Sequence, residues 1–407
     1  MIDRPLYLNK LMSWKDKDII KVITGIRRCG KSRILDSFAL KLKEQGITEE
    51  QIIHLNFEEM GDEQISDAKT LHDMIDSRLK ANKDKMTYIM LDEVQKIPEW
   101  EKAVASLRLR KNADLYLTGS NAYMLSSELA TFLSGRYVEI KMLPLSFKEF
   151  LTFHKFPNDM SMERKFALYI KFGGMPSLKD FDFSERQSYE VLDGIYNTVL
   201  IKDVASRAKN TNTQVIEKII HFLADNIANI SSVNSITNTL YSEKSIESKN
   251  NAYVNDCIGL LEKAFIFYPV QRYDVKGKEL LRSLEKYYIV DNGLRYRILN
   301  RVSDNGRILE NIVYFELLRR GYTVFIGKYE DKEIDFIATK QDEKLYIQVN
   351  DRMDANKTFS RELGVLQQIR DSHPKMVLTN DEMLVGSTED GIKIVSLLEW
   401  LLKDYEA

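Results

Sequence analysis

Cysteines and long apolar runs are both scarce in this sequence. Only Cys29 and Cys257 are present, far apart, so we expect no disulfide framework and a reducing, cytoplasmic setting. No stretch reaches about 18 consecutive apolar residues, so we expect no membrane-spanning helix. The N-terminus lacks the basic segment and apolar run that are typical of a signal peptide. A net charge of −2 gives no whole-protein attraction to nucleic acid or to an anionic membrane.

The size and balance of the chain indicate an ordinary globular protein. It has 407 residues, of which 44% are hydrophobic and 29% are charged. A chain of this length has room for two or three domains of typical size.

The strongest local signal is a glycine-rich turn between an apolar strand at residues 19–24 and an amphipathic helix at residues 32–46. The turn, Gly25 to Ser32, reads G-x-x-x-x-G-K-S, which is the P-loop pattern. Glycines let backbone N–H groups approach phosphate oxygens, while Lys31 would reach the β- and γ-phosphates and the Ser32 hydroxyl would bind Mg²⁺. The predicted nucleotide-binding residues are Gly25, Ile26, Arg27, Arg28, Cys29, Gly30, Lys31, Ser32 and Arg33.

Arg27, Arg28 and Cys29, three of the four residues between these glycines, have a simpler interpretation. Their side chains are expected to point away from the phosphates. Cys29 is interpreted as a space-filling residue, with a redox role as the alternative.

A P-loop alone could belong to a kinase, a GTPase or an ATPase. An acidic pair at the end of a second apolar strand helps to distinguish these classes. The stretch that begins at Thr87 predicts an apolar strand that ends in Asp92 and Glu93. Asp92 would hold the magnesium shell and Glu93 would act as a general base on the attacking water. The simpler alternative is that both residues only begin a loop. No N-K-x-D stretch accompanies the P-loop, which favours ATP over GTP.

Two further residues are weaker catalytic candidates. Asn121 follows a third strand that begins at residue 113, and it could orient water against the γ-phosphate, although T-G-S-N is also ordinary turn chemistry. Arg136 follows a glycine and precedes a strand, the placement of an arginine finger acting in cis or from a neighbouring chain. A surface arginine is an equal alternative for this position.

The order of these stretches resembles bacterial and archaeal AAA-type P-loop ATPases. The matching stretches are GIRRCGKS, LDEVQ, LTGSNA and LSGR, followed by FGGMPSL and IYNTVLIKDVASR, and at the C-terminus by ENIVYFELLRRGYTVFIG and EIDFIA. The resemblance covers nearly the whole chain. It implies an AAA- and STAND-like α/β core with a parallel sheet, then a helical lid, a winged helix and a small α/β restriction-endonuclease-like domain. The expected domains are 1–145, 146–210, 211–300 and 301–407.

The predicted winged helix consists of three helices followed by a hairpin whose turn contains Gly277. Basic residues on or near the hairpin are nearly balanced by Asp274, Glu279 and Glu285, so duplex DNA and a protein partner both stay open, with a protein slightly favoured. The basic residues are Arg272, Lys276, Lys278, Arg282 and Lys286.

The predicted nuclease-like site lacks one acid and the usual lysine. Glu310 on a helix and Asp335 on a strand match the acidic positions of the resembled nucleases, but Gln348 replaces the third acid and Asn350 replaces the lysine. Fewer carboxylates weaken Mg²⁺ binding, and no nearby residue supplies the lysine, since Lys344 lies on the turn side. We therefore expect this domain to be inactive or very weak as a nuclease.

The sequence thus predicts a Mg²⁺-dependent ATPase whose nucleotide state is coupled to the later domains. The alternatives are a slowly hydrolysing nucleotide switch that binds a partner, and an ATP-licensed DNase. An oligomer is possible, and the sequence does not decide whether DNA or a protein is the partner.

Overall fold

The computed structural model describes residues 4–58, 65–122, 135–205, 212–301, 304–351 and 357–404. Contacts divide the chain into two units, one comprising Met1–Pro144 with Lys263–Phe265 and the other comprising Leu145–Glu262 with Ile266–Ala407. The first boundary lies next to the end predicted for the ATPase core. No helix of the described ranges is long and apolar enough to cross a membrane.

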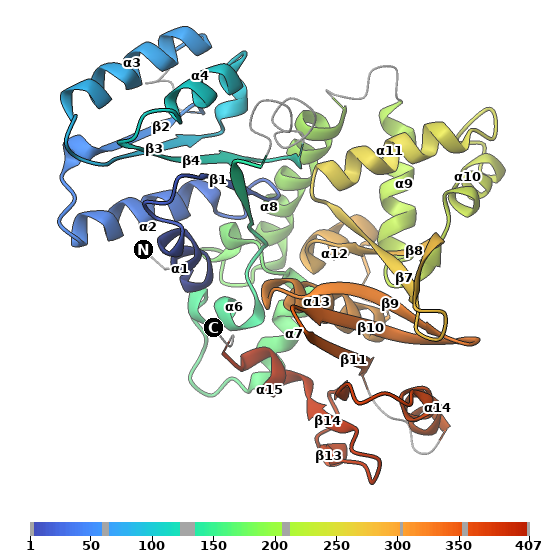
Figure 1. Ribbon diagram of the computed structural model, residues 1–407. Helices are drawn as coiled ribbons and strands as arrows, with labels where there is room; N and C mark the ends of the chain where they lie inside the picture. The colour runs from blue at the N-terminus through green and yellow to red at the C-terminus, as the bar shows by residue number, and fades with distance from the viewer. Residues whose placement is uncertain are drawn as a thin grey trace. The chain divides into compact units, whose positions relative to one another are not determined.

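The first unit is built on a five-stranded parallel sheet in the order β2-β3-β4-β1-β5 (Figure 1). The predicted α/β class and parallel sheet are therefore confirmed. The strands are β1 (Ile20–Thr24), β2 (Ile52–Asn56), β3 (Thr87–Asp92), β4 (Ala113–Gly119) and β5 (Tyr137–Lys141). The helices are α1 (Pro5–Ser13), α2 (Lys31–Glu44), α3 (Ala68–Ala81) and α4 (Trp100–Leu107), with short 3₁₀ turns η1 (Glu49–Gln51) and η3 (Val94–Lys96).

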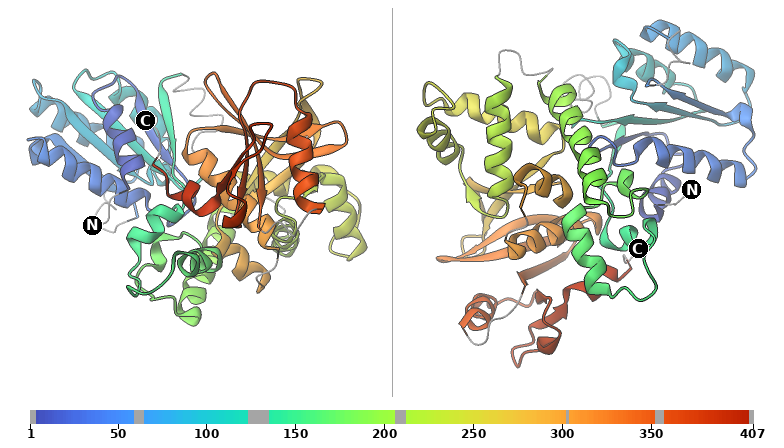
Figure 2. Two further views of the ribbon diagram at one scale, coloured as in Figure 1. Left: turned by 90° about the horizontal axis from the view of Figure 1, so that it is seen from below. Right: turned by 180° about the vertical axis from the view of Figure 1, so that it is seen from behind.

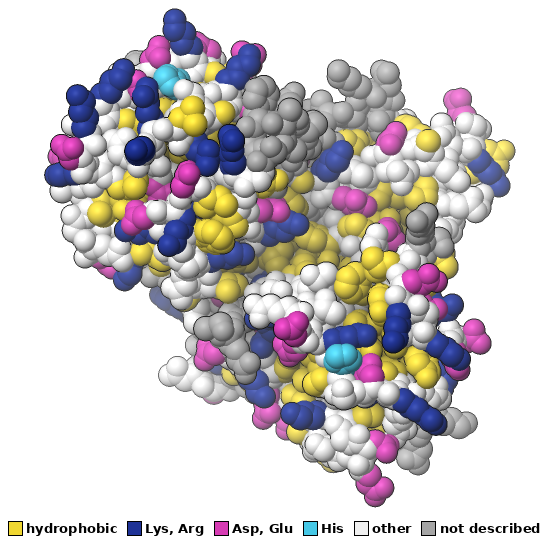
Figure 3. All heavy atoms as spheres, viewed as in Figure 1, with side chains coloured by type: hydrophobic (Ala, Val, Ile, Leu, Met, Phe, Trp, Pro, Cys, Tyr) yellow, Lys and Arg dark blue, Asp and Glu magenta, His cyan; other side chains and the backbone are white. Residues whose placement is uncertain are grey.

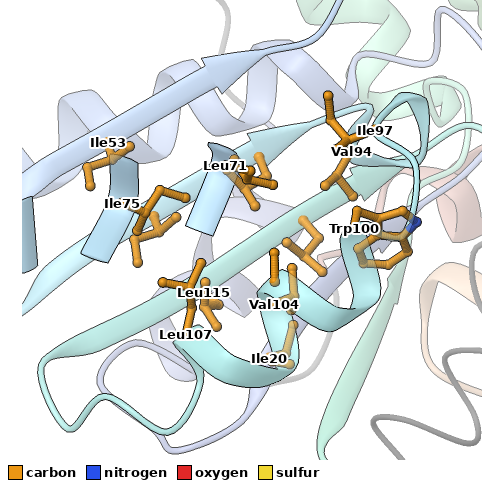
Figure 4. Packing of buried hydrophobic residues seen from close by; sticks show 14 of the residues in the cluster. Ile20, Ile53, Leu71, Ile75, Val94, Ile97, Trp100, Val104, Leu107 and Leu115 are labelled. Atoms are coloured by element: carbon orange, nitrogen blue, oxygen red, sulfur yellow. The ribbon is translucent and has the colours of Figure 1, made fainter. Parts of the chain in front are cut away.

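Both faces of this sheet are covered by helices, which is why its strands are apolar throughout. Strands β1 and β3 are buried at every position, as parallel sheets between two helical layers require. On one face, Leu71 and Ile75 of α3 and Trp100 and Val104 of α4 pack against strand residues such as Leu115 (Figure 4). On the other face lies α2, whose apolar stripe is Ile34, Leu35, Phe38 and Leu42.

The second unit begins with helices, as residues 146–210 predict. Its helices are α6 (Phe147–Phe153), α7 (Met162–Phe172), α8 (Glu185–Thr198), the π-helical turn η6 (Val199–Val204), α9 (Thr213–Asp225), α10 (Val233–Ser242), α11 (Asn251–Lys263), α12 (Asn292–Leu299), α13 (Asn305–Arg319), α14 (Lys357–Gln368) and α15 (Leu397–Leu402), with 3₁₀ turns η5 (Pro176–Leu178) and η8 (Glu382–Leu384).

A nine-stranded mixed sheet follows, in the order β13-β14-β12-β11-β10-β9-β7-β8-β6 (Figures 1 and 2). Its core includes Ile334, Tyr346, Leu366, Val377 and Ile394. The strands are β6 (Ile230–Ser231), β7 (Phe267–Asp274), β8 (Glu279–Ile289), β9 (Thr323–Tyr329), β10 (Lys332–Lys340), β11 (Glu343–Asn350), β12 (Lys375–Thr379), β13 (Gly386–Ser387) and β14 (Lys393–Ser396).

This sheet differs from the expected pair of separate C-terminal domains. The three helices α9 to α11 and the β7–β8 hairpin are present, with Gly277 in the turn as predicted. However, β7 also pairs in parallel with β9, through Arg272 to Ile326 and two following positions. The predicted boundary at residue 300 therefore lies within one unit and one sheet. Hydrophobic patterning indicated strands on either side of residue 300 but carried no information on which of them pair across that boundary.

FGGMPSL is one of the stretches shared with the resembled ATPases. A contact within the second unit explains its two glycines. The carboxylate of Asp291 accepts hydrogen bonds from the backbone N–H of Gly174 at 2.6 Å and of Leu294 at 3.0 Å. Gly173 has φ of +75°, and a Cβ there would lie 2.3 Å from Asp291 Oδ1. This buried carboxylate therefore holds the turn after α7 against the start of α12, and only glycine fits opposite it.

We expect Gly173→Ala to destabilise the second unit by about 2–5 kcal/mol, because a left-handed alanine is strained and its methyl group overpacks the site. Urea unfolding followed by circular dichroism measures the change. Gly259→Ala is the matched control, since nothing lies within 4 Å of a Cβ at that position in α11. It should stabilise the protein by about 0.5–1 kcal/mol. Equal midpoints for the two variants would contradict this role for Gly173.

Candidate functional site

The P-loop begins directly where β1 ends, at the carboxyl edge of the parallel sheet. Gly25 has φ of +148°, and a Cβ there would lie 2.2 Å from the carbonyl oxygen of Met142. Gly30 has φ of +102° and caps the N-terminus of α2. Both positions thus need glycine, one for a close approach and one for a left-handed turn. The loop leads into a helix N-terminus, where phosphate groups bind in many proteins.

The remaining side chains of the loop divide into buried and outward-facing groups. Ile26 and Cys29 are buried, and burial raises the pKa of the Cys29 thiol, which keeps it protonated. That agrees with the space-filling interpretation. Arg27 Nη1 lies 3.2 Å from Glu58 Oε1. The residues that face outward at the loop and the start of α2 are Arg28, Ser32 and Arg33.

The side chain of Lys31 lies folded inside the loop. Its ammonium donates hydrogen bonds to the carbonyl oxygens of Gly25 at 3.1 Å and Ile26 at 3.3 Å, and its Nζ lies 3.7 Å from Glu93 Oε1. The P-loop lysine and the predicted general base therefore form a buried ion pair beside the loop. A phosphate group arriving there would offer Lys31 a stronger, charged acceptor than either carbonyl.

The acidic pair after β3 is held by the neighbouring strand β4. The Thr118 hydroxyl donates to Asp92 Oδ1 and accepts from the Glu93 backbone N–H at 2.9 Å. Glu93 has φ of +54°, in the left-handed region that non-glycine residues seldom adopt. Backbone strain of this kind is concentrated at functional sites.

Two buried oxygen atoms at this edge are suited to a magnesium ion and its water shell. Asp92 Oδ2 and Asn121 Oδ1 are buried and have no hydrogen-bond partner among the described residues. A buried carboxylate oxygen without a partner is costly and points to an external ligand. Across the ranges with described structure, no cluster of three or more His, Cys, Asp or Glu is placed to hold a metal ion alone. Asp92 and Ser32 therefore fit magnesium that arrives with phosphates, its usual mode of binding.

Arg136 lies at the opposite edge of the sheet from these residues. It directly precedes β5, whose first residue Tyr137 pairs with Ile20 at the start of β1. The P-loop follows the other end of β1, a strand of five residues that spans roughly 16 Å. The structure therefore does not bring Arg136 to the nucleotide site of its own chain. The position of Arg136 could not be predicted from the sequence, because it depends on which strand β5 pairs with.

Arg4 and Gln95 of this site were not predicted from the sequence, and Thr118 was considered only as part of the T-G-S-N strand tip. The buried guanidinium of Arg4 donates to the carbonyl oxygens of Cys29 at 3.1 Å and Leu143 at 2.9 Å, which fastens the P-loop to the chain after β5. Thr118 links the two acidic residues, and Gln95 donates from its amide nitrogen to Glu93 Oε2. The stretches LTGSN and LDEVQ contained the latter two residues, but Arg4 lies far from any motif.

The nuclease-like residues come together in the second unit. Glu310 lies on α13, Asp335 on β10 and Gln348 on β11. The backbone N–H of Asp335 donates to Gln348 Oε1 at 2.6 Å, and Asp335 Oδ2 accepts from the N–H of Val349 at 2.8 Å. Strands β10 and β11 pair antiparallel, so Asp335 and Gln348 lie side by side, and the Gln348 amide binds the backbone.

A lysine does reach this cluster, contrary to the sequence-based expectation. Lys286 on β8 is buried, with Nζ 2.9 Å from Glu310 Oε1 and 2.6 Å from Glu333 Oε1. Tyr288 OH donates to the same Glu310 oxygen at 2.5 Å. Burial alone would lower the pKa of Lys286, but the carboxylates of Glu310, Asp335 and Glu333 outweigh it and raise that pKa. Lys286 is therefore a charged internal group, not a basic residue on the wing surface.

The hairpin turn itself carries balanced charge. Lys276 Nζ lies 3.0 Å from Glu330 Oε1, while the side chain of Arg282 lies outside the described residues. On the face of the molecule in Figure 3, basic and acidic side chains are interspersed. Of the two lysines at the turn, Lys276 is therefore met by a neighbouring acid, whereas Lys278 is exposed and has no ion pair among the described residues.

Known protein families match two parts of this chain. Residues 17–151 match a family described as AAA domain, and residues 163–305 match a domain of unknown function (DUF8612). An uncharacterized protein of Haemophilus influenzae is 41% identical over 406 residues, 99% of each chain. The uncharacterized protein MJ1544 of Methanocaldococcus jannaschii is 29% identical and covers 94% of this chain and 88% of its own length.

Among solved structures, a Walker-type ATPase of Pyrococcus abyssi is similar to this chain. The TM-score is 0.51 at 16% identity, over 73% of this chain and 96% of that one. At such low identity the likeness concerns the fold, which is that of a P-loop ATPase.

Proposed function

We propose, from the premise that this chain belongs to the same family as the uncharacterized Haemophilus influenzae protein and carries an AAA domain over residues 17–151, that it binds MgATP and hydrolyses it. The observation that carries the proposal is the shared carboxyl edge of the sheet. The P-loop lysine, the Asp92–Glu93 pair and Asn121 all lie at that edge. Ligands of open α/β sheets bind at this edge.

Binding would depend on the loop and on Lys31. Backbone N–H groups of the loop and the N-terminus of α2 favour a polyphosphate. The Lys31 ammonium would exchange its two carbonyl acceptors for phosphate oxygens. Ser32 faces outward at the start of α2, where its hydroxyl would join Asp92 in holding magnesium.

Hydrolysis would depend on Glu93 as the general base. Its Oε1 faces Lys31, which places it on the side where the terminal phosphate would lie. From there the carboxylate would take a proton from the attacking water. Asn121 would orient the same water or the terminal phosphate from the end of β4. Bound magnesium would supply charge neutralisation at the phosphates.

Calorimetric titration with MgATP, MgGTP and EDTA-treated ATP tests this proposal. We expect saturable heat with MgATP at a Kd of about 1 mM or below, weaker heat without magnesium, and phosphate release in steady state. The absence of heat with every nucleotide, in protein shown to be folded, would remove the proposal.

A second candidate is a nucleotide switch that hydrolyses ATP slowly. The position of Arg136 favours it, because an arginine finger raises turnover by about 10³–10⁵-fold and this arginine does not reach its own site. Fast hydrolysis would then require an oligomer in which another copy of the chain supplies Arg136. Turnover of the isolated chain below about one per minute, under the usual enzyme range, would favour the switch.

The second unit is proposed to bind a partner whose access depends on the nucleotide. Its helices α9 to α11 and the β7–β8 hairpin fit the winged-helix layout, for which duplex DNA and a protein are both candidates. The charge balance at the hairpin favours a protein. The buried ion pairs of Lys286 support an inactive nuclease-like site, since the lysine is bound to two carboxylates.

A further inference from the structure

Glu93 has two carboxylate oxygens with different surroundings. Oε1 lies 3.7 Å from Lys31 Nζ. Oε2 accepts a hydrogen bond from the amide nitrogen of Gln95, two residues further along the chain. The first oxygen therefore faces the P-loop lysine, and the second is bound by the side chain of Gln95. A general base needs one oxygen free for water and a fixed orientation of its carboxylate.

The backbone explains how Gln95 reaches back to Glu93. The left-handed conformation of Glu93 begins the 3₁₀ turn η3, and the N–H of Lys96 donates to the carbonyl oxygen of Glu93 at 3.1 Å. This tight turn brings residues 93 and 95 together directly after the strand. The contact between the two side chains is therefore made within a turn that begins at the left-handed residue.

The amide oxygen of Gln95 gives a second observation. Gln95 Oε1 is buried and has no hydrogen-bond donor among the residues with described structure. A buried amide oxygen without a donor is costly unless a ligand or water supplies one. The same side chain therefore holds Glu93 with its nitrogen and presents an unsatisfied acceptor beside it.

We propose that Gln95 is a positioning residue for ATP hydrolysis, which holds the Glu93 carboxylate with one oxygen toward the attacking water. This inference rests on the proposed ATPase function. Gln95 holds Glu93 Oε2, so that Oε1 stays directed at the position of the terminal phosphate. Its own Oε1 accepts a hydrogen bond from water in the working site. Gln95 itself takes no proton and contacts no phosphate.

Gln95→Leu tests the hydrogen bond, because leucine has a similar size and no donor. We expect kcat to fall by about 10–100-fold, the loss typical of a misplaced catalytic group. The Kd for MgATP should change by no more than about threefold, since Gln95 contacts no phosphate in this proposal. Lys96→Gln, on the same turn and exposed, is the matched control and should keep kcat within about twofold.

Gln95→Glu provides a readout that a purely structural role would not change. Two adjacent carboxylates repel each other, and at lower pH they share one proton that restores the hydrogen bond. The ratio of variant kcat to wild-type kcat should therefore rise as pH falls from about 8 to about 6. Gln95→Glu also tests the inference on its own if Gln95→Leu does not fold.

The outcomes separate this inference from the proposed function. Wild-type protein without turnover would remove the ATPase proposal and this inference with it. Wild-type turnover with unchanged or raised kcat in Gln95→Leu would overturn the inference alone. Parallel loss of MgATP binding in that variant, or a flat pH ratio in Gln95→Glu, would also overturn it, since both indicate a structural role.

Discussion

Replacing Glu93 by glutamine is expected to lower kcat for ATP hydrolysis by about 10²–10³-fold, within the range for loss of a general base. Glutamine keeps the shape of the side chain but cannot accept the proton from water. The negative charge facing Lys31 also disappears, so MgATP should bind at least as tightly as to the wild type. The variant should therefore accumulate bound, intact ATP, which is measured by releasing and separating the nucleotide after gel filtration.

Lys31→Ala is the matched control for this trapping experiment. It removes the ammonium at the phosphates, so it should abolish binding and retain no nucleotide. If Glu93→Gln turned over ATP at the wild-type rate, the general-base assignment would be wrong, although the binding site would stand. If Lys31→Ala still retained ATP, the nucleotide would be bound somewhere other than the P-loop.

The sequence predicted the first unit well because its signals are local. A strand, two glycines, a lysine and a helix lie next to one another along the chain, and Asp92 ends an apolar strand. Each of these features is set by neighbouring residues, and the parallel sheet follows from alternating strands and helices. The buried strands and the position of the loop needed no long-range information.

What the sequence did not predict depends on strand pairing. Arg136 stands beside Ile20, at the wrong edge of the sheet, only because β5 pairs in parallel with β1. Lys286 points inward because β8 faces α13, which lies later in the chain. Alternation along β8 allowed either face to be buried, and the nuclease pattern places its lysine on the strand of Gln348, not on β8. Register and pairing decide such positions, and they are properties of the whole fold.

Lys286→Met is expected to destabilise the second unit by about 3–5 kcal/mol, the usual effect of leaving a buried charge without its partner. Methionine keeps most of the volume, so the effect comes from the carboxylates of Glu310 and Glu333, which lose the ammonium between them. Urea unfolding monitored by tyrosine fluorescence and circular dichroism measures the loss. Lys286→Arg keeps the charge and should lose less stability.

A double-mutant cycle shows whether the ion pair is the cause. Glu310→Gln removes one carboxylate, and in the Lys286→Met background it should cost less than in the wild type, or even restore stability, because it relieves a buried unpaired charge. Lys276→Met is the surface control on the same hairpin, and its exposed pair with Glu330 should leave the midpoint unchanged. Additive effects of Lys286→Met and Glu310→Gln would contradict the coupling. In that case Lys286 would stabilise the second unit through packing, and its charge would not stabilise the carboxylates of the nuclease-like cluster.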